Sequence, residues 1–152
     1  MRPMAKTRQH VGAEMPALFA LLIDPDTYPQ WLVGTKAMRA VDDDWPAVGS
    51  RFHHRVGVGP LTVDDATTIV EIDEPHRLVL HVRATMLIKA TVRFCLRPDG
   101  EGTEIEMEEE PRHRVLGNLV RPVLDPVTHS RNAASLAKLA DLAQRRAGTS
   151  GG

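Results

Sequence analysis

The sequence is poor in the features that mark a covalent scaffold, a membrane span or a nucleic-acid surface. Its 152 residues include one cysteine, Cys95, which excludes an internal disulfide and a multi-cysteine zinc site. No apolar run reaches the ~18 residues that a membrane helix needs. The formal net charge is −1, so no basic excess favours a nucleic-acid partner. What remains has the composition of a soluble globular domain.

The length and the two ends of the sequence indicate how many domains to expect and whether a leader or a tail is present. Residues 1–6 are basic, but no apolar segment follows them, so we predict no secretory leader and expect a reducing, cytoplasmic location. A chain of this length suits one domain, because roughly 70% of its unfolded surface can be buried in a single core. We expect residues 1–146 to form that domain and residues 147–152 to be a disordered tail.

The first two-thirds of the sequence change from mixed strand and helix patterns to strands alone. Residues 6–11 predict a short strand, and residues 14–22 predict a helix with a proline in its first turn, where the missing N–H costs no hydrogen bond. A second, short helix is expected next, capped by Asp26 or Thr27. Residues 36–110 then show strand segments separated by turns too short for crossover helices, which predicts antiparallel hairpins.

The last hairpin has the most distinct pattern. A tight turn on Asp99-Gly100 would place Phe94 opposite Ile105, on an apolar inner face that also holds Met107 and Glu109. The outer face of the second strand then carries an acidic row, which we expect to be solvated and matched by a basic partner strand. This row consists of Glu104, Glu106, Glu108 and Glu110.

The C-terminal part of the sequence predicts helix. Residues 116–124 have helical spacing of apolar side chains, but Pro122 and Pro126 interrupt the pattern. We therefore expect the main helix to begin at Pro126 and to end near Arg146, over roughly 30 Å. Stepping 100° per residue, its apolar face holds His129, Asn132, Ala133, Leu136, Leu139, Ala140 and Ala143.

A strand, two short helices, about six antiparallel strands and a long helix form the order of the helix-grip fold. Several segments match that fold as well: 24–31, 45–50, 57–60, 71–78, 103–109, and Arg131-Asn132 with Leu136 and Leu139. With these segments the sequence resembles the START-like superfamily, in particular its polyketide cyclase/dehydrase-like ligand-binding (SRPBCC) branch, over residues 8–145. The resemblance implies an α+β fold in which a curved antiparallel β-sheet wraps around the long C-terminal α-helix.

The resemblance also implies a cavity between the sheet and the helix. Relatives use this cavity to carry lipids, quinones, hormones or polyketides, and a few of them catalyse aromatisation or cyclisation. The superfamily has no shared catalytic motif, so no catalytic residue is transferred to this chain. Since the fold hosts many functions, the likeness predicts the fold better than the function.

Polar residues at inward positions are candidates for the polar end of such a cavity. His54 and Glu109 are each two residues away from apolar residues of their strands, so they are expected to point to the same face of the sheet as those residues. His129 and Asn132 lie on the apolar face of the last helix. Burying an unpartnered polar group costs about 1–3 kcal/mol, so each must pair with another, meet water or bind a ligand. Together with inner apolar and aromatic positions, the candidate ligand-binding residues are Tyr28, Trp31, His54, Phe94, Met107, Glu109, His129 and Asn132.

Three functional hypotheses follow, and a purely structural role stays open beside them. The first is the binding or transport of a small apolar molecule, such as a lipid, a quinone or a polyketide-like compound. The second is an aromatase/cyclase- or dehydratase-type enzyme in which His54 and Glu109 act as general acid and base. The third is a co-chaperone-like interaction module with a filled core. In the structural alternative, Glu109 ends its strand near solvent and the histidines have local partners.

No metal site and no cofactor are predicted. His53 and His54 are adjacent in a strand, so their side chains point to opposite faces and cannot share an ion. The segment 57–60 lacks the third glycine and the following helix of a nucleotide-binding loop, and predicts a hairpin turn instead. The expected partner is a small apolar ligand, without nucleic acid or an integral membrane segment, and the protein is expected to be a monomer or a homodimer.

Overall fold

Over the residues that it describes, the computed structural model has seven strands, a long C-terminal helix and short helices after the first strand. These residues are 5–32, 35–58, 61–83, 89–111 and 114–150, and side chains are described for part of them. In chain order the elements are β1 (Ala5–Val11), α1 (Met15–Leu22), the 3-10 turn η1 (Pro25–Thr27), α2 (Tyr28–Trp31), β2 (Thr35–Val41), β3 (Arg51–Val58), β4 (Leu61–Asp73), β5 (Arg77–Arg83), β6 (Lys89–Asp99), β7 (Gly102–Pro111) and α3 (Arg114–Ser150).

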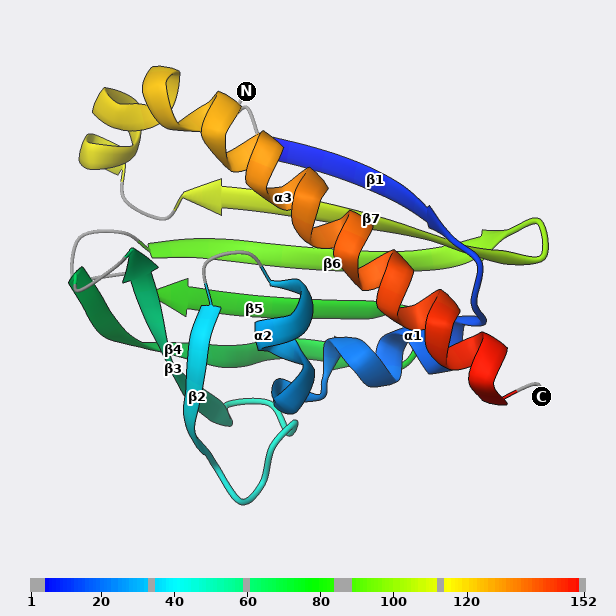
Figure 1. Ribbon diagram of the computed structural model, residues 1–152. Coiled ribbons are helices and arrows are strands. Elements are labelled where there is room, and N and C mark those ends of the chain that lie inside the picture. Colours follow the sequence, from blue (N-terminus) through cyan, green and yellow to red (C-terminus); the bar gives the residue numbers. More distant parts are fainter. Residues whose placement is uncertain (1–4, 33–34, 59–60, 84–88, 112–113, 151–152) are drawn as a thin grey trace.

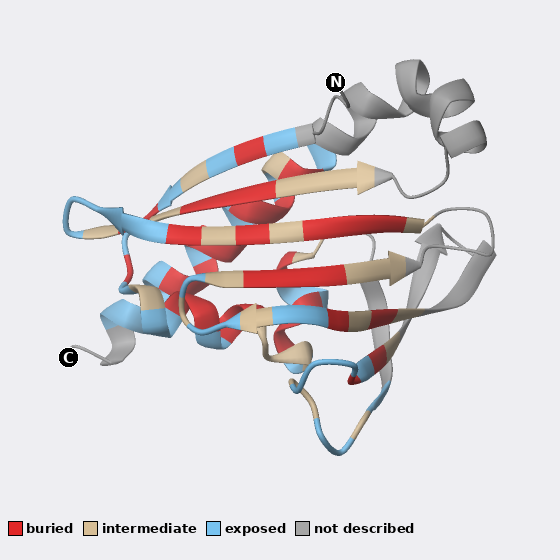
Figure 2. Ribbon diagram, turned by 180° about the vertical axis from the view of Figure 1, so that it is seen from behind, coloured by how far each residue is buried: buried red, intermediate tan, exposed pale blue. Residues whose placement is uncertain are grey.

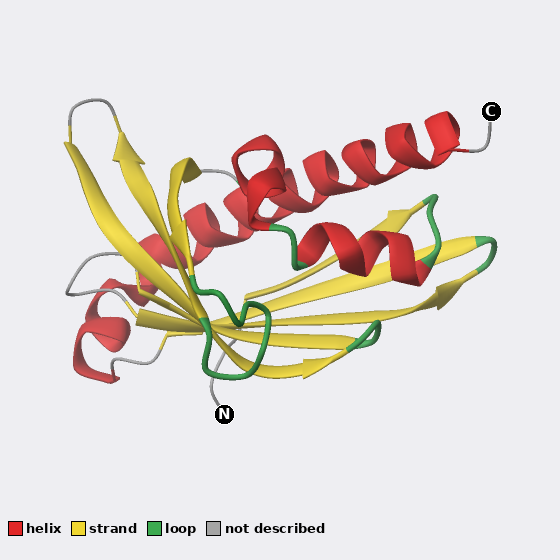
Figure 3. Cartoon of the chain, turned by 90° about the horizontal axis from the view of Figure 1, so that it is seen from below, coloured by secondary structure: helices red, strands yellow, loops and turns green. Residues whose placement is uncertain are grey.

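The sheet is an antiparallel meander that the first strand extends. Its order is β1-β7-β6-β5-β4-β3-β2, so the strands from β2 to β7 follow one another as hairpins and β1 pairs with β7. The sheet is curved, and α1, α2 and α3 all lie on its concave side (Figure 1, Figure 3). Short turns between strands force this antiparallel arrangement, because a parallel pair would need a long crossover. The predicted α+β helix-grip architecture is confirmed.

The core fills the space between the concave face of the sheet and the helices. It includes Phe19 from α1, Phe52 from β3 and Leu139 from α3, each buried completely or nearly so. Figure 2 shows that buried residues gather in β5, β6, β7 and the helices behind them, whereas the turn between β6 and β7 is exposed. None of the helices within the described ranges combines the length and the apolar character that a bilayer crossing requires.

The two short helices after β1 are held by local hydrogen bonds. The side chain of Asp24 accepts a hydrogen bond from the backbone N–H of Asp26 at 3.1 Å and so caps η1. Thr27 is the N-cap residue of α2, as one of the two predicted caps, but its side chain makes no capping hydrogen bond, because its hydroxyl donates to the Leu21 carbonyl oxygen at 3.0 Å. An Asx cap of this kind ends one helix and starts the next within a few residues.

The hairpin between β6 and β7 differs from the predicted register by two residues. The strands are joined through the loop 100–101, in which Gly100 has φ +62°, a conformation that favours glycine. Phe94 therefore lies opposite Met107 rather than opposite Ile105. Because the shift is even, every side chain keeps its predicted face, and the apolar inner face is as expected.

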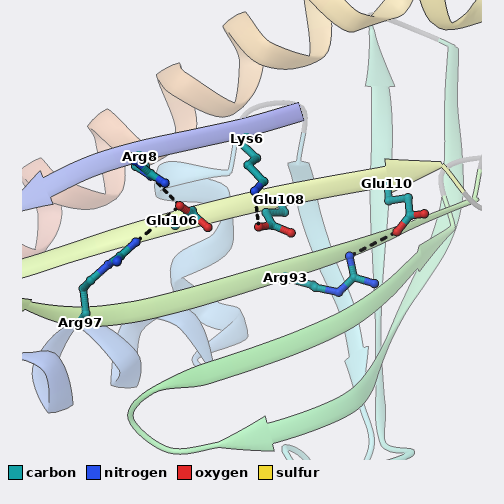
Figure 4. A network of polar contacts seen from close by, with 7 residues as sticks. All are labelled: Lys6, Arg8, Arg93, Arg97, Glu106, Glu108 and Glu110. Atoms are coloured by element: carbon teal, nitrogen blue, oxygen red, sulfur yellow. Dashed lines mark hydrogen bonds and ion pairs between the residues drawn. The ribbon is translucent and has the colours of Figure 1, made fainter. Parts of the chain in front are cut away.

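The acidic row of β7 is enclosed rather than solvated, contrary to our expectation. The side chains of Glu106, Glu108 and Glu110 are 11%, 15% and 15% exposed. β7 is an interior strand, so cations from both β1 and β6 reach the row (Figure 4). The ion pairs are Lys6–Glu108 at 3.4 Å, Arg8–Glu106 at 2.5 Å, Arg93–Glu110 at 3.3 Å, Arg97–Glu104 at 3.0 Å and Arg97–Glu106 at 3.6 Å.

The C-terminal helix is longer than the sequence pattern predicts. α3 runs without a break from Arg114 to Ser150, so the backbone continues through Pro122 and Pro126 instead of starting afresh at Pro126. Each proline removes one helical N–H, and the first turns of α3 bend away from the direction of the rest (Figure 1). Residues 147–150 continue the helix, while the division of the chain into one domain and a tail stays a prediction.

Candidate ligand-binding site

A row of buried side chains crosses the concave face of the sheet and ends at a carboxylate. In the strand register, Glu109 of β7 lies opposite Val92 of β6, which lies opposite Leu80 of β5, which in turn lies opposite Ile69 of β4. The three apolar residues of this row are between 1% and 6% exposed. Glu109 shares the parity of buried Met107, so strand alternation directs it to the same inner side. An acidic residue thus continues an otherwise apolar row.

The partners of this carboxylate come from α3. Arg131 Nη2 donates to both oxygens of Glu109, at 3.0 Å to Oε1 and 2.9 Å to Oε2. Asn132 Nδ2 donates to Oε2 at 3.3 Å. Consecutive residues of a helix point about 100° apart, so Asn132 is 2% exposed in the interior while the Arg131 side chain, 44% exposed, approaches from the rim. We call Glu109, Arg131 and Asn132 the inner cluster.

The inner cluster balances its own charge. The Glu109 side chain is 14% exposed, and a carboxylate so far from water is costly unless a cation and hydrogen-bond donors compensate it. Arg131 supplies the opposite charge, and Asn132 adds a donor without adding charge. The structure therefore brings together two of the predicted site residues, Glu109 and Asn132, and joins them by a direct hydrogen bond.

The aromatic candidates are locked into the core by their polar atoms. The hydroxyl of Tyr28 donates to the Leu22 carbonyl oxygen, and Trp31 Nε1 donates to the hydroxyl of Thr27 at 3.1 Å. Both rings are 2% exposed, and burial raises the pKa of Tyr28 far above its ordinary value. The ring of Trp31 also meets Phe94 edge-on, at 6.4 Å between centroids. With their polar atoms used locally, these residues offer apolar ring surface rather than hydrogen bonds.

The remaining candidates divide into buried apolar residues and histidines. Phe94 and Met107 face each other across β6 and β7 and are both 3% exposed. His54 and His129 lie on β3 and α3, but their side chains are outside the described residues. Along the sheet, β4, β5 and β6 separate the strands of His54 and Glu109. Their proposed pairing as acid and base stays a prediction.

Arg131 is the member of the inner cluster that sequence reasoning missed as a site residue. It lies beside the apolar face of the predicted helix rather than on it, so periodicity alone assigns it to solvent. The available signal was its place next to Asn132, combined with an inward carboxylate on the last strand that needs a cation. Among the described residues, no group of three or more His, Cys, Asp or Glu side chains is arranged to hold a metal ion.

Comparison with known protein families assigns the chain to one family. The family model described as "Polyketide cyclase / dehydrase and lipid transport" matches residues 4–144. The chain belongs to this family. The match confirms the resemblance to the SRPBCC branch of the START-like superfamily. No curated protein matches the sequence significantly.

Several solved structures are similar to this member of the polyketide cyclase/dehydrase and lipid transport family. Three of them illustrate how varied these proteins are. Ara h 8.0201 is 11% identical with a TM-score of 0.74, covering 93% of this chain and 97% of that one. The Aha1 dimer from Colwellia psychrerythraea is 13% identical with a TM-score of 0.69, covering 93% and 96%. The di-domain ARO/CYC StfQ from the steffimycin biosynthetic pathway is 15% identical with a TM-score of 0.74, covering 94% and 51%. At these identities the likeness establishes the fold alone.

Proposed function

We propose that this protein binds a small apolar molecule between the sheet and α3, with the inner cluster contacting the polar end of the ligand. The observation that carries the proposal is the position of Glu109, at the end of a row of buried apolar residues. This ion pair contributes little to folding, because the Arg131 side chain is 44% exposed and solvent screens the pair. Small-molecule sites, in contrast, are usually apolar with a few convergent polar groups.

The location of the ligand follows from how the interior is filled. The C-terminal half of α3 packs on the core through Leu136, Leu139 and Ala143, all buried. Asn132 and Glu109 lie at the end of this packed region that is nearer the start of α3. We therefore place the apolar part of the ligand beyond the inner cluster, on the side away from Leu139.

The arrangement favours binding over proton transfer. Arg131 and Asn132 together donate three hydrogen bonds to Glu109, which hold the carboxylate toward α3 rather than toward a proton to be removed. A general base needs free access to the proton that it removes. The family description and the similar ARO/CYC structure keep a cyclase or dehydratase as the second candidate, and the carboxylate of Glu109 would be its catalytic group.

The first experiment is native mass spectrometry of gently purified protein, followed by organic extraction of any bound molecule. The test variant replaces both members of the ion pair, Glu109→Leu with Arg131→Leu, and the control is Glu101→Gln in the exposed hairpin loop. We expect the double variant to fold with wild-type stability and to lose the resident ligand, while the control keeps it. Equal ligand content in all three proteins, or no ligand in any of them together with no binding of added apolar probes, would contradict the proposed function.

The enzymatic alternative has its own test. If turnover of a polyketide-like substrate is found, Glu109→Gln should abolish it while leaving the unfolding temperature within a few degrees of wild type. A carrier would show binding without turnover in either protein. A filled core that excludes every apolar probe would instead favour the interaction module.

A further inference from the structure

The hydrogen bonds within the inner cluster leave part of the carboxylate available. Among the contacts of the described residues, Glu109 Oε2 accepts from both Arg131 and Asn132, whereas Oε1 accepts from Arg131 alone. An ionised carboxylate has about four acceptor sites and no donor. A ligand group that joins this cluster at Oε1 therefore has to bring a hydrogen-bond donor.

The charge of the cluster restricts that donor further. Glu109 and Arg131 cancel, and Asn132 is neutral, so the cluster offers no net charge to attract an ion. An anionic ligand that bound Arg131 would compete with Glu109 for this cation, and it would place a second negative charge beside the Glu109 carboxylate, whose side chain is 14% exposed. A cationic ligand would meet the Arg131 guanidinium at the rim. Like charges brought close together repel, and they do so more strongly where water is partly excluded, so both kinds of ion are disfavoured.

We infer that the ligand is an electrically neutral apolar molecule with a hydroxyl group, an alcohol or a phenol, whose O–H donates to Oε1 of Glu109. This inference rests on the proposed function. A hydroxyl suits the site because O–H···O⁻ bonds are shorter and about twice as strong as bonds between neutral groups. Free fatty acids and amines are accordingly excluded as the preferred class, and hydroxyl-bearing lipids, hydroquinones and phenolic polyketides are retained.

Three probes of one skeleton test the inference at pH 7: 2-naphthol, 2-methoxynaphthalene and 2-naphthoate, titrated into the full chain by calorimetry. The first has a neutral O–H, the second has the same oxygen without a proton, and the third is an anion. A hydrogen bond to a charged group is worth about 1.5–3 kcal/mol. We therefore expect 2-naphthol to bind at least ~10-fold more tightly than either of the other probes.

Variants then assign the preference to the carboxylate. In Glu109→Gln the acceptor is no longer charged, so we expect the preference for 2-naphthol over 2-methoxynaphthalene to shrink by several-fold, and the penalty on 2-naphthoate to fall. Glu101→Gln, in the exposed hairpin loop, should leave both ratios unchanged. Unfolding curves of the two variants confirm that each is folded before its ratios are compared.

The outcomes separate this inference from the proposed function. Equal binding of the three probes, or tighter binding of 2-naphthoate, would overturn the hydroxyl preference and leave ligand binding intact. If no probe binds, the molecule extracted from the purified protein decides: a neutral hydroxyl-bearing compound supports the inference, and an acid or an amine overturns it. An absence of both probe binding and extracted ligand would overturn the inference and the proposed function together.

Discussion

The two faces of β7 use glutamate in opposite ways. On the outer face, Glu106 and its neighbours are paired with cations of the adjacent strands β1 and β6, so the ion pairs form within the sheet (Figure 4). On the inner face, Glu109 takes both of its partners from α3. The outer row therefore stabilises the pairing of β7 with its neighbouring strands, and the inner cluster links β7 to α3. Glutamate therefore has a structural role on the outer face and is a candidate binding group on the inner face, because its partners differ between the two faces.

Reversing the charge of the inner glutamate should have the largest effect. Glu109→Lys would place a cation, flanked by buried apolar residues, next to Arg131. We expect a loss of about 3–5 kcal/mol in the free energy of unfolding, measured by urea denaturation. Glu101→Lys in the exposed loop is the control and should change stability by less than about 0.5 kcal/mol. A small loss for Glu109→Lys would mean that the carboxylate is better solvated than its surroundings indicate.

Removing the cation of the inner cluster should have a moderate effect. In Arg131→Met the carboxylate of Glu109 keeps only the hydrogen bond from Asn132. Because the Arg131 side chain is 44% exposed and solvent screens the pair, we expect a loss of about 1 kcal/mol by urea denaturation. Arg131→Lys should restore part of the loss. Full stability in Arg131→Met would show that water compensates Glu109, and would weaken the distinction between the two faces.

The inner side also offers a test of what an unpartnered polar group costs. Thr7 of β1 lies opposite Met107, is 7% exposed, and its hydroxyl has no hydrogen-bond partner among the described residues. Thr7→Val keeps the shape and removes the orphan hydroxyl. We expect a gain of about 1 kcal/mol, measured as a higher urea midpoint at an unchanged slope. Destabilisation would indicate that water or a ligand satisfies this hydroxyl.

The outer row should respond to acid. The hydrogen bond from Arg8 lowers the pKa of Glu106 in the folded protein, with support from Glu108 and Lys6. Since the folded pKa is the lower one, this contribution to stability is fully present above the ordinary pKa of a glutamate and is lost as the pH falls through the folded value. The stability advantage of wild type over Glu106→Gln should therefore shrink between pH 7 and pH 3. A difference that does not vary with pH would assign it to packing instead of charge.

The sequence predicts the faces of the strands better than it predicts their partners. Parity placed Ile105, Met107 and Glu109 on the inner side, and an error of two residues in the hairpin register left that assignment intact. The error arose because the turn around Gly100 can close in two ways that local residues hardly distinguish. Parity is a local property, whereas the pairing of β1 with β7 joins segments about 100 residues apart and has no local signature.

The inner cluster shows the same limit. Helical periodicity identified Asn132 as inward, and strand alternation identified Glu109, but nothing in either pattern says that the two meet. The enclosure of the outer row was missed for the same reason, because β1 supplies Lys6 and Arg8 from the far end of the chain. The break expected at Pro126 was wrong because α3 tolerates two prolines in its first half.

The attachment of β1 has a consequence for how the protein comes into being. β1 pairs with β7 and packs beneath α3, and the backbone N–H of Gly12 donates to the side-chain oxygen of Gln144 at 2.9 Å. The hairpins from β2 to β6 can form as they leave the ribosome, but β1 has to wait for β7, which follows it by about 100 residues. Such distant contacts slow folding. During synthesis β1 therefore stays unpaired until β7, about 100 residues later, has been made.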